Sequence, residues 1–255
     1  MLDQFLGRIF SSWMVLVILV VVLLALSEFG WRVGLARSRA IPEKTKDGGS
    51  VPTAVLTLLG FSFAMAASRH ETRRELVVQE ANSIITTARR ASLLPEPQAD
   101  NVSRLLREYV AVRIEAHRET QFSQRFAALR KSSADLHERL WNEAVAAAAK
   151  QPTPITASFI ASLNETIDFE ATRIAAKRNH VPGAVWLLLL CVAGCGLWLT
   201  EWEAGIAGGH SFLARFLFPL LIAVVIVLIT DIDTPRGGLI PMDDRPLLEL
   251  NDSLK

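Results

Sequence analysis

Histidine and cysteine are the side chains of this chain best suited to bind a metal or attack a substrate. The five histidines have no metal-ligand spacing to one another: His70, His117, His137, His180 and His210. Cys191 and Cys195 stand four residues apart in one apolar stretch, as small packing residues would. No serine, cysteine or lysine lies in an activating motif, and Gly237-Gly238 is too short for a phosphate-binding loop. We therefore expect no catalytic residues, no metal and no cofactor, and an enzyme is the weakest hypothesis.

A second set of residues could line a path for water and ions, because small or polar side chains share one face of an expected helix. Small or polar side chains recur every three or four residues, on one face of a helix: Thr53, Thr57, Gly60, Ala64 and Ser68. Such a stripe permits close packing of helices in lipid, or it lines a water-filled pore. Phe61 and Met65 extend this face, and Arg69 and Arg73 follow at the same step of four. Around a symmetric oligomer they would form an apolar constriction beside an anion-attracting basic ring; alternatively, the arginines only mark the membrane boundary.

Four apolar stretches without charged residues indicate membrane spans, and the face described above lies on the second of them. They are residues 9–27, 51–67, 181–200 and 216–230. The first and third have the length of a membrane span, about 20 residues. The second and fourth are short, but they can span if Arg69 and Arg215 extend to the interface. Trp13 and Trp31 bracket the first stretch as interfacial tryptophans do, and a cleavable signal peptide is the alternative for it.

The charged segment 68–180 is expected to be helical. No Gly or Pro occurs between Phe61 and Leu94, so one helix should run from the second apolar stretch to about Leu94. Two more helices follow, and a fourth should start at Pro154 with Thr153 as its cap and run on into the third apolar stretch. We expect the charges of this segment to form a solvated surface.

Apolar stripes at helical spacing predict the core of this segment. The second helix contributes Val102, Leu105, Leu106, Tyr109 and Val112. The third contributes Phe122, Phe126, Leu129, Leu136 and Leu140, and the fourth Ile155, Phe159, Leu163, Ile167 and Ile174.

Positive residues near the spans indicate the orientation. The side with both termini and residues 68–180 has more flanking Arg and Lys than the other, although the first loop is also basic. Cytoplasmic loops carry this excess, so we expect the termini and the charged segment in the cytoplasm. The net charge of +1 and the lack of interleaved aromatic and basic residues argue against a nucleic-acid partner.

These observations predict an all-α integral membrane protein with four transmembrane helices and a cytoplasmic helical insert between the second and third. The expected parts are a first transmembrane pair (1–67), the cytoplasmic domain (68–180), a second pair (181–232) and a C-terminal tail (233–255). The tail is too apolar to be free, and we expect it to pack on the cytoplasmic domain or on a neighbouring subunit. Its apolar residues are Leu239, Ile240, Leu247, Leu248 and Leu250.

Two segments resemble the bacterial bestrophin-like membrane proteins. The first is residues 58–69 (LLGFSFAMAASR), followed by paired arginines at 73–74 and 89–90 and by residues 80–84 (EANSI). The second is residues 231–240 (DIDTPRGGLI), followed by residues 245–248 (RPLL). The span layout matches as well, so the resemblance covers nearly the whole chain. It implies a multi-pass protein of the bacterial inner membrane.

The chain is also distantly similar to true bestrophins, which are pentameric ion channels whose second span lines the pore. Leu59-Gly60-Phe61 resembles a Leu-Gly-Phe segment of their pore helix. Thr53 and Thr57 stand where bestrophins place bulky apolar residues of a narrow neck. The calcium-binding acidic run of animal bestrophins is missing here, so calcium gating is not implied.

The resemblance implies an oligomeric channel for small inorganic ions, most simply a homo-pentamer in the lipid bilayer. Its pore-lining residues would be Thr53, Thr57, Gly60, Phe61, Ala64 and Met65, with Arg69 and Arg73 as an ion-attracting ring. The alternative is a non-conducting membrane scaffold or sensor whose helical insert binds a partner.

Overall fold

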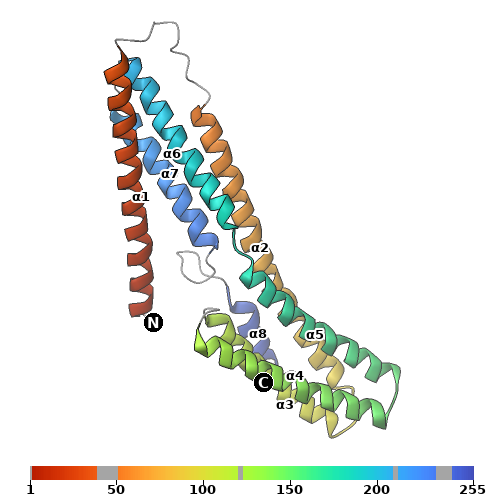
Figure 1. Cartoon of the computed structure of the whole chain (residues 1–255). Coiled ribbons are helices and arrows are strands. Elements are labelled where there is room, and N and C mark those ends of the chain that lie inside the picture. The colour runs from red at the N-terminus through yellow and green to blue at the C-terminus, as the bar shows by residue number, and fades with distance from the viewer. Residues whose placement is uncertain (1, 39–50, 120–122, 209–211, 234–242) are drawn as a thin grey trace. The chain divides into compact units, whose positions relative to one another are not determined.

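The computed structural model describes residues 2–38, 51–119, 123–208, 212–233 and 243–255, and no strand occurs within these ranges. Eight helices are described (Figure 1). They are α1 (Leu2–Arg37), α2 (Val51–Ala91), α3 (Gln98–Arg118), α4 (Gln124–Lys150), α5 (Pro154–Arg178), α6 (Gly183–Ile206), α7 (Phe212–Asp233) and α8 (Arg245–Ser253). The predicted all-α class is confirmed for the described residues.

The chain divides into two compact units. The first consists of Met1–His70 and His180–Pro241, and the second of Glu71–Asn179 and Met242–Lys255. The long helix α2 contributes its first half to the first unit and its second half to the second unit.

The first unit contains the apolar helices. Among the described residues, three stretches are long and apolar enough to cross a membrane: Trp13–Arg37, Pro154–Ile206, whose apolar part is α6, and Arg215–Asp233. The first half of α2 is not one of these three stretches. The fourth span expected from residues 51–67 therefore stays a prediction.

Glycines let α1 and α6 approach at backbone distance. A Cβ built on Gly30 would lie 2.6 Å from the carbonyl oxygen of Trp198, and one on Gly34 would collide with the carbonyl of Trp202. Gly205 of α6 meets the backbone of α1 in the same way. Small residues four apart are typical of helix pairs in lipid, where close packing replaces the hydrophobic effect as the driving force.

The second unit is built around one apolar core. Most residues of the three predicted stripes are buried in this core, which also contains Val77 and Ile84 of α2 and Leu247 and Leu250 of α8. Phe126 and Leu129 are buried in a smaller apolar cluster with Ala116. Ile155 differs from the expectation, because it is 47% exposed in the first turn of α5. Phe122, Leu239 and Ile240 lie outside the described residues.

The helix boundaries follow the local chemistry of their ends. α2 is continuous to Ala91, as the absence of Gly and Pro predicted. Thr153 caps α5 by accepting a hydrogen bond from the Thr156 backbone N–H (3.3 Å), and Pro154 occupies the first turn.

The expectation that α5 runs on into α6 is wrong. α5 ends at Arg178, and α6 begins at Gly183. Pro182 has no N–H and restrains the residue before it to an extended conformation. The N–H of Val181 donates instead to the Asp233 carboxylate, at 3.1 and 3.2 Å from its two oxygens.

Candidate functional site

The first half of α2 has one covered face and one uncovered face. Val55, Leu59, Ser62 and Ala66 are buried within the first unit. The predicted pore-lining residues lie on the other side: Thr53, Thr57, Gly60, Phe61 and Ala64 are exposed, and Met65 is half-buried. Phe61 is 68% exposed, so little of the described part of the chain packs over its aromatic ring. The stripe read from the sequence is therefore one continuous face.

Within the described ranges, this uncovered face does not pack closely against another helix at Gly60. A Cβ built on Gly60 would meet nothing within 4 Å, in contrast to the crowded Gly30 and Gly34. The Thr57 hydroxyl donates to the Thr53 carbonyl oxygen (2.8 Å), which leaves the lone pairs of the hydroxyl available to water or an ion. Among the described residues, no side chain or backbone therefore crowds Gly60 on this face.

The two arginines after this face have different environments. Arg69 is half-buried, and its Nη1 atom has no hydrogen-bond partner among the described residues. Arg73 is only 5% exposed, and it donates to the carbonyl oxygens of Ala176 (3.3 Å) and Asn179 (2.7 Å) at the end of α5. A cation at this position stabilises the negative end of a helix. Arg73 thus links α2 to the end of α5, and the ring expected from Arg69 and Arg73 stays a prediction.

A cluster of charged residues links three apolar helices of the first unit. Arg215 of α7 is ion-paired with Glu28 of α1, and its Nε lies 3.5 Å from an oxygen of Glu201 of α6. The guanidinium also stacks over the Trp31 ring, 4.7 Å from its centroid. Two carboxylates and an indole hold Arg215, and its extension to the membrane interface stays a prediction.

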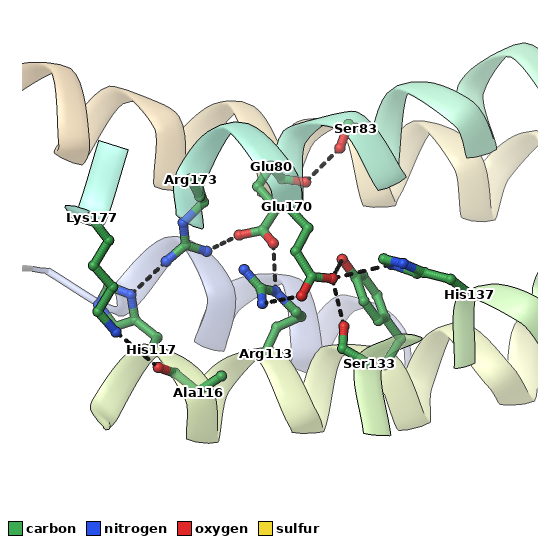
Figure 2. Close-up of polar contacts among 11 residues, drawn as sticks. Glu80, Ser83, Arg113, Ala116, His117, Ser133, His137, Glu170, Arg173 and Lys177 are labelled. Carbon is green, nitrogen blue, oxygen red and sulfur yellow. Dashed lines mark hydrogen bonds and ion pairs between the residues drawn. The ribbon is translucent and has the colours of Figure 1, made fainter. Parts of the chain in front are cut away.

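A buried ionic network lies in the second unit (Figure 2). Glu80 of α2 accepts a hydrogen bond from Arg113 Nε of α3 (2.6 Å) and is ion-paired with Arg173 of α5. Arg113 Nη1 also donates to Glu170 Oε1 of α5 (2.9 Å). Two carboxylates thus alternate with two guanidinium groups. Removing one partner of such a buried pair typically costs about 3–5 kcal/mol, so the loss of one member of the network should destabilise the unit.

The second oxygen of Glu170 extends the network to α4. Glu170 Oε2 accepts hydrogen bonds from Tyr109 (3.0 Å) and Ser133 (2.5 Å), and it lies 3.2 Å from His137 Nε2. Burial raises the pKa of this carboxyl, but His137, the charge of Arg113 and the Ser133 hydroxyl outweigh burial and lower the pKa to about 2. Glu170 therefore stays ionised at neutral pH, and burial raises the pKa of the Tyr109 hydroxyl that contacts it.

The other end of the network reaches the end of α3. Arg173 Nη2 lies 2.8 Å from His117 Nδ1. A guanidinium only donates, so Nδ1 accepts and the proton of the neutral ring is on Nε2. Lys177 donates to the Glu119 carbonyl oxygen (2.8 Å) and lies over the Phe126 ring at 4.3 Å. Burial lowers the pKa of Arg173 to about 10, which still leaves it charged at neutral pH.

The expectation that the charges of residues 68–180 form a solvated surface is wrong for this subset. Arg73, Glu80, Arg113 and Glu170 are all buried. Their spacing contained a signal, because each charge stands at a position of the apolar stripe. Arg113 follows Tyr109 by four residues, and comparable steps lead from Val77 to Glu80 and from Ile167 to Glu170.

Comparisons with known proteins agree with this architecture. A family model described as a bestrophin-like domain matches residues 49–247. A crystal structure of a membrane protein mutant has a TM-score of 0.70 at 14% identity, over 94% of this chain and 95% of that chain. A mutant of a bacterial bestrophin homologue from Klebsiella pneumoniae has a TM-score of 0.68 at 15% identity, over 94% of this chain and 96% of that chain.

A second mutant structure of the Klebsiella pneumoniae homologue gives a TM-score of 0.67 at 15% identity, over 93% of this chain and 95% of that chain. At 14–15% sequence identity, these structural similarities show that the fold is shared and nothing more. No curated protein matches the chain. The family match covers most of the chain and confirms the resemblance drawn from residues 58–69 and 231–240. The chain therefore belongs to the bestrophin-like family.

Proposed function

We propose that this protein is an oligomeric ion channel in which the uncovered face of α2 lines the pore. The observation that carries the proposal is that this face has mostly small or polar side chains and is left uncovered by the described residues, while the opposite face of the same helix is buried. Copies of the chain around an axis would bring these faces together and enclose water between them. Bestrophins use their second span in this way, and the family membership supports the same arrangement here.

Phe61 is the expected narrowest point of this pore. Its exposed aromatic side chain is flanked along the same face by Thr57 and Ala64. One phenylalanine from each subunit would therefore narrow a pore whose wall otherwise consists mostly of small or polar side chains. Apolar constrictions of this kind gate by dewetting. Thr53 and Thr57 would then line the wider part of the pore on one side of the constriction, with Met65 on the other.

The selectivity proposal depends on Arg69 more than on Arg73. Arg73 donates hydrogen bonds to backbone carbonyl oxygens at the end of α5, and these dipoles partly compensate its charge. Arg69 Nη1 has no hydrogen-bond partner in the part of the chain that the structure describes, and Arg69 stands eight residues after Phe61 on the same side of the helix. A ring of Arg69 side chains favours anions, and we propose a mild anion preference.

The assembly is proposed to be a homo-pentamer in the bacterial inner membrane, with both termini and the second unit in the cytoplasm. The positive residues near the spans support this orientation. A non-conducting scaffold remains the second candidate, because the second unit is a well-packed helical domain that could bind a partner. The position of α2 in the assembly discriminates between the two.

Disulfide cross-linking tests that position. In a protein lacking Cys191 and Cys195, Phe61→Cys places one thiol on the proposed axis, and Leu187→Cys places one on α6 at a similar exposure, 65%. A disulfide requires Cβ atoms about 3.5–4.5 Å apart. We expect oxidation to link copies of Phe61→Cys and to leave Leu187→Cys monomeric on a denaturing gel. Cross-linking only through position 187 would place α2 away from the axis and favour the scaffold.

A further inference from the structure

A groove between α4 and α5 of the second unit has the size of a small-molecule site. Its volume is about 380 Å³, within the usual range for ligand pockets. Its walls are largely aliphatic, with Ala134 from α4 and Ile167, Ala171, Ile174 and Ala175 from α5. Such walls would cover the apolar body of a ligand and leave the recognition of any charge to the remaining residues.

Two arginines stand at one end of this groove. α4 and α5 are joined by residues 151–153 and run antiparallel, so Arg130 and Arg178 lie toward the same end. His137 and Glu170, which are 3.2 Å apart, lie toward the other end. Seven or eight helical residues separate the two ends, which corresponds to about 10–12 Å.

The charges at the two ends differ in how they are compensated. Glu170 is matched by Arg113 at 2.9 Å, and both its oxygens accept hydrogen bonds within the unit. Among the residues that the structure describes, neither Arg130 nor Arg178 has a hydrogen-bond or ion-pair partner. The groove therefore offers two uncompensated guanidinium groups at one end and a closed, neutralised network at the other.

We propose that this groove binds a phosphate monoester, with Arg130 and Arg178 as the ligands of its phosphate and the aliphatic walls against its organic part. A phosphate monoester carries a charge of about −1.5 to −2 at neutral pH, which matches two arginines, whereas a carboxylate would leave one arginine uncompensated. The planar guanidinium group also suits phosphate oxygens because it donates two parallel hydrogen bonds. The phosphate belongs either to a soluble molecule or to a lipid headgroup.

Calorimetric titration of the full-length protein in neutral detergent tests the soluble source, with phenyl phosphate as the probe. We expect saturable binding that weakens at least tenfold in Arg130→Gln/Arg178→Gln and is weaker for benzoate. The matched control, Arg125→Gln/Arg139→Gln, removes two exposed arginines of α4 that do not line the groove and are paired with other residues. It should bind like the wild type. Circular dichroism checks that the variants are folded.

Nanodiscs containing phosphatidic acid, a monoester lipid, test the second source against nanodiscs of phosphatidylcholine alone. Stabilisation by phosphatidic acid that disappears in Arg130→Gln/Arg178→Gln supports the groove with a lipid ligand. Binding of either probe that is unchanged in this variant overturns the proposal, as does the absence of binding to both. The assays measure no current, so their outcome is independent of whether the protein conducts.

Discussion

The carboxylate of Glu170 should control how the stability of the second unit depends on pH. Its pKa is lowered from 4.5 to about 2 in the folded protein. A depressed pKa means that the ionised form stabilises the fold above the unfolded-state pKa, and that this contribution is lost as the pH falls through the folded-state value. Glu170 is buried, and a shift of about 2.5 units corresponds to about 3 kcal/mol of unfolding free energy. The loss should occur between about pH 4.5 and pH 2.

Replacing this carboxylate removes both its charge and its pH dependence. Glu170→Gln leaves Arg113 with one carboxylate partner instead of two, and we expect a loss of about 3–5 kcal/mol at pH 7. The acid-induced loss between pH 4.5 and pH 2 should shrink by about 3 kcal/mol relative to the wild type. Glu165→Gln is the matched control, because Glu165 is an exposed carboxylate on the same helix.

Urea unfolding of the detergent-solubilised protein, followed by circular dichroism at several pH values, measures these effects. The helical signal of the second unit is the part expected to respond, since apolar helices stay in the micelle. If Glu170→Gln and Glu165→Gln unfold at the same urea concentration at pH 7, and if both keep the wild-type acid transition, the network does not stabilise the unit as described.

Three further predictions concern packing and orientation. Gly34→Ala should lower the thermal midpoint of the solubilised protein, because a Cβ there collides with α6. Gly183→Ala is the control and should leave the midpoint unchanged, because a Cβ there meets nothing within 4 Å. Equal midpoints would contradict the close approach of α1 and α6. Leu247→Ala should lower the free energy of unfolding in urea by about 2–5 kcal/mol, because the Leu247 side chain is fully buried. Leu93→Ala should change it little, because Leu93 is exposed. An unchanged unfolding free energy in Leu247→Ala would show that α8 is dispensable for the core. A cysteine at Lys131 should react with an impermeant reagent only after cells are opened, and ready labelling of intact cells would reverse the orientation.

Local sequence signals predicted the helices and most of the core. α2 is continuous because nothing between Phe61 and Leu94 interrupts a helix. Thr153 and Pro154 marked the start of α5 because a cap and a proline act within one turn. The break between α5 and α6 was visible in principle as Pro182, but the apolar residues on both sides of it suggested one helix.

The buried network could not be predicted in the same way. Arg113 is 33 residues from Glu80 and 57 from Glu170, and their pairing depends on how separate helices pack. A charged residue on an apolar stripe is a local sign that the charge is buried, but the local sequence does not indicate which residue pairs with it. The contacts of Arg73 show the same difficulty, since its partners at the end of α5 lie 103 and 106 residues away in the sequence.

Planar-bilayer recording of the purified protein tests the central proposal most directly. We expect discrete currents from the wild type with a mild anion preference, and larger or less gated currents from Phe61→Ala with unchanged assembly, because the exposed ring supports no packing within the chain. Phe63→Ala is the control, two residues away on a different side of α2. An assembled oligomer that carries no current in the wild type or in Phe61→Ala, at any voltage or with any ion, would contradict the channel and leave the scaffold.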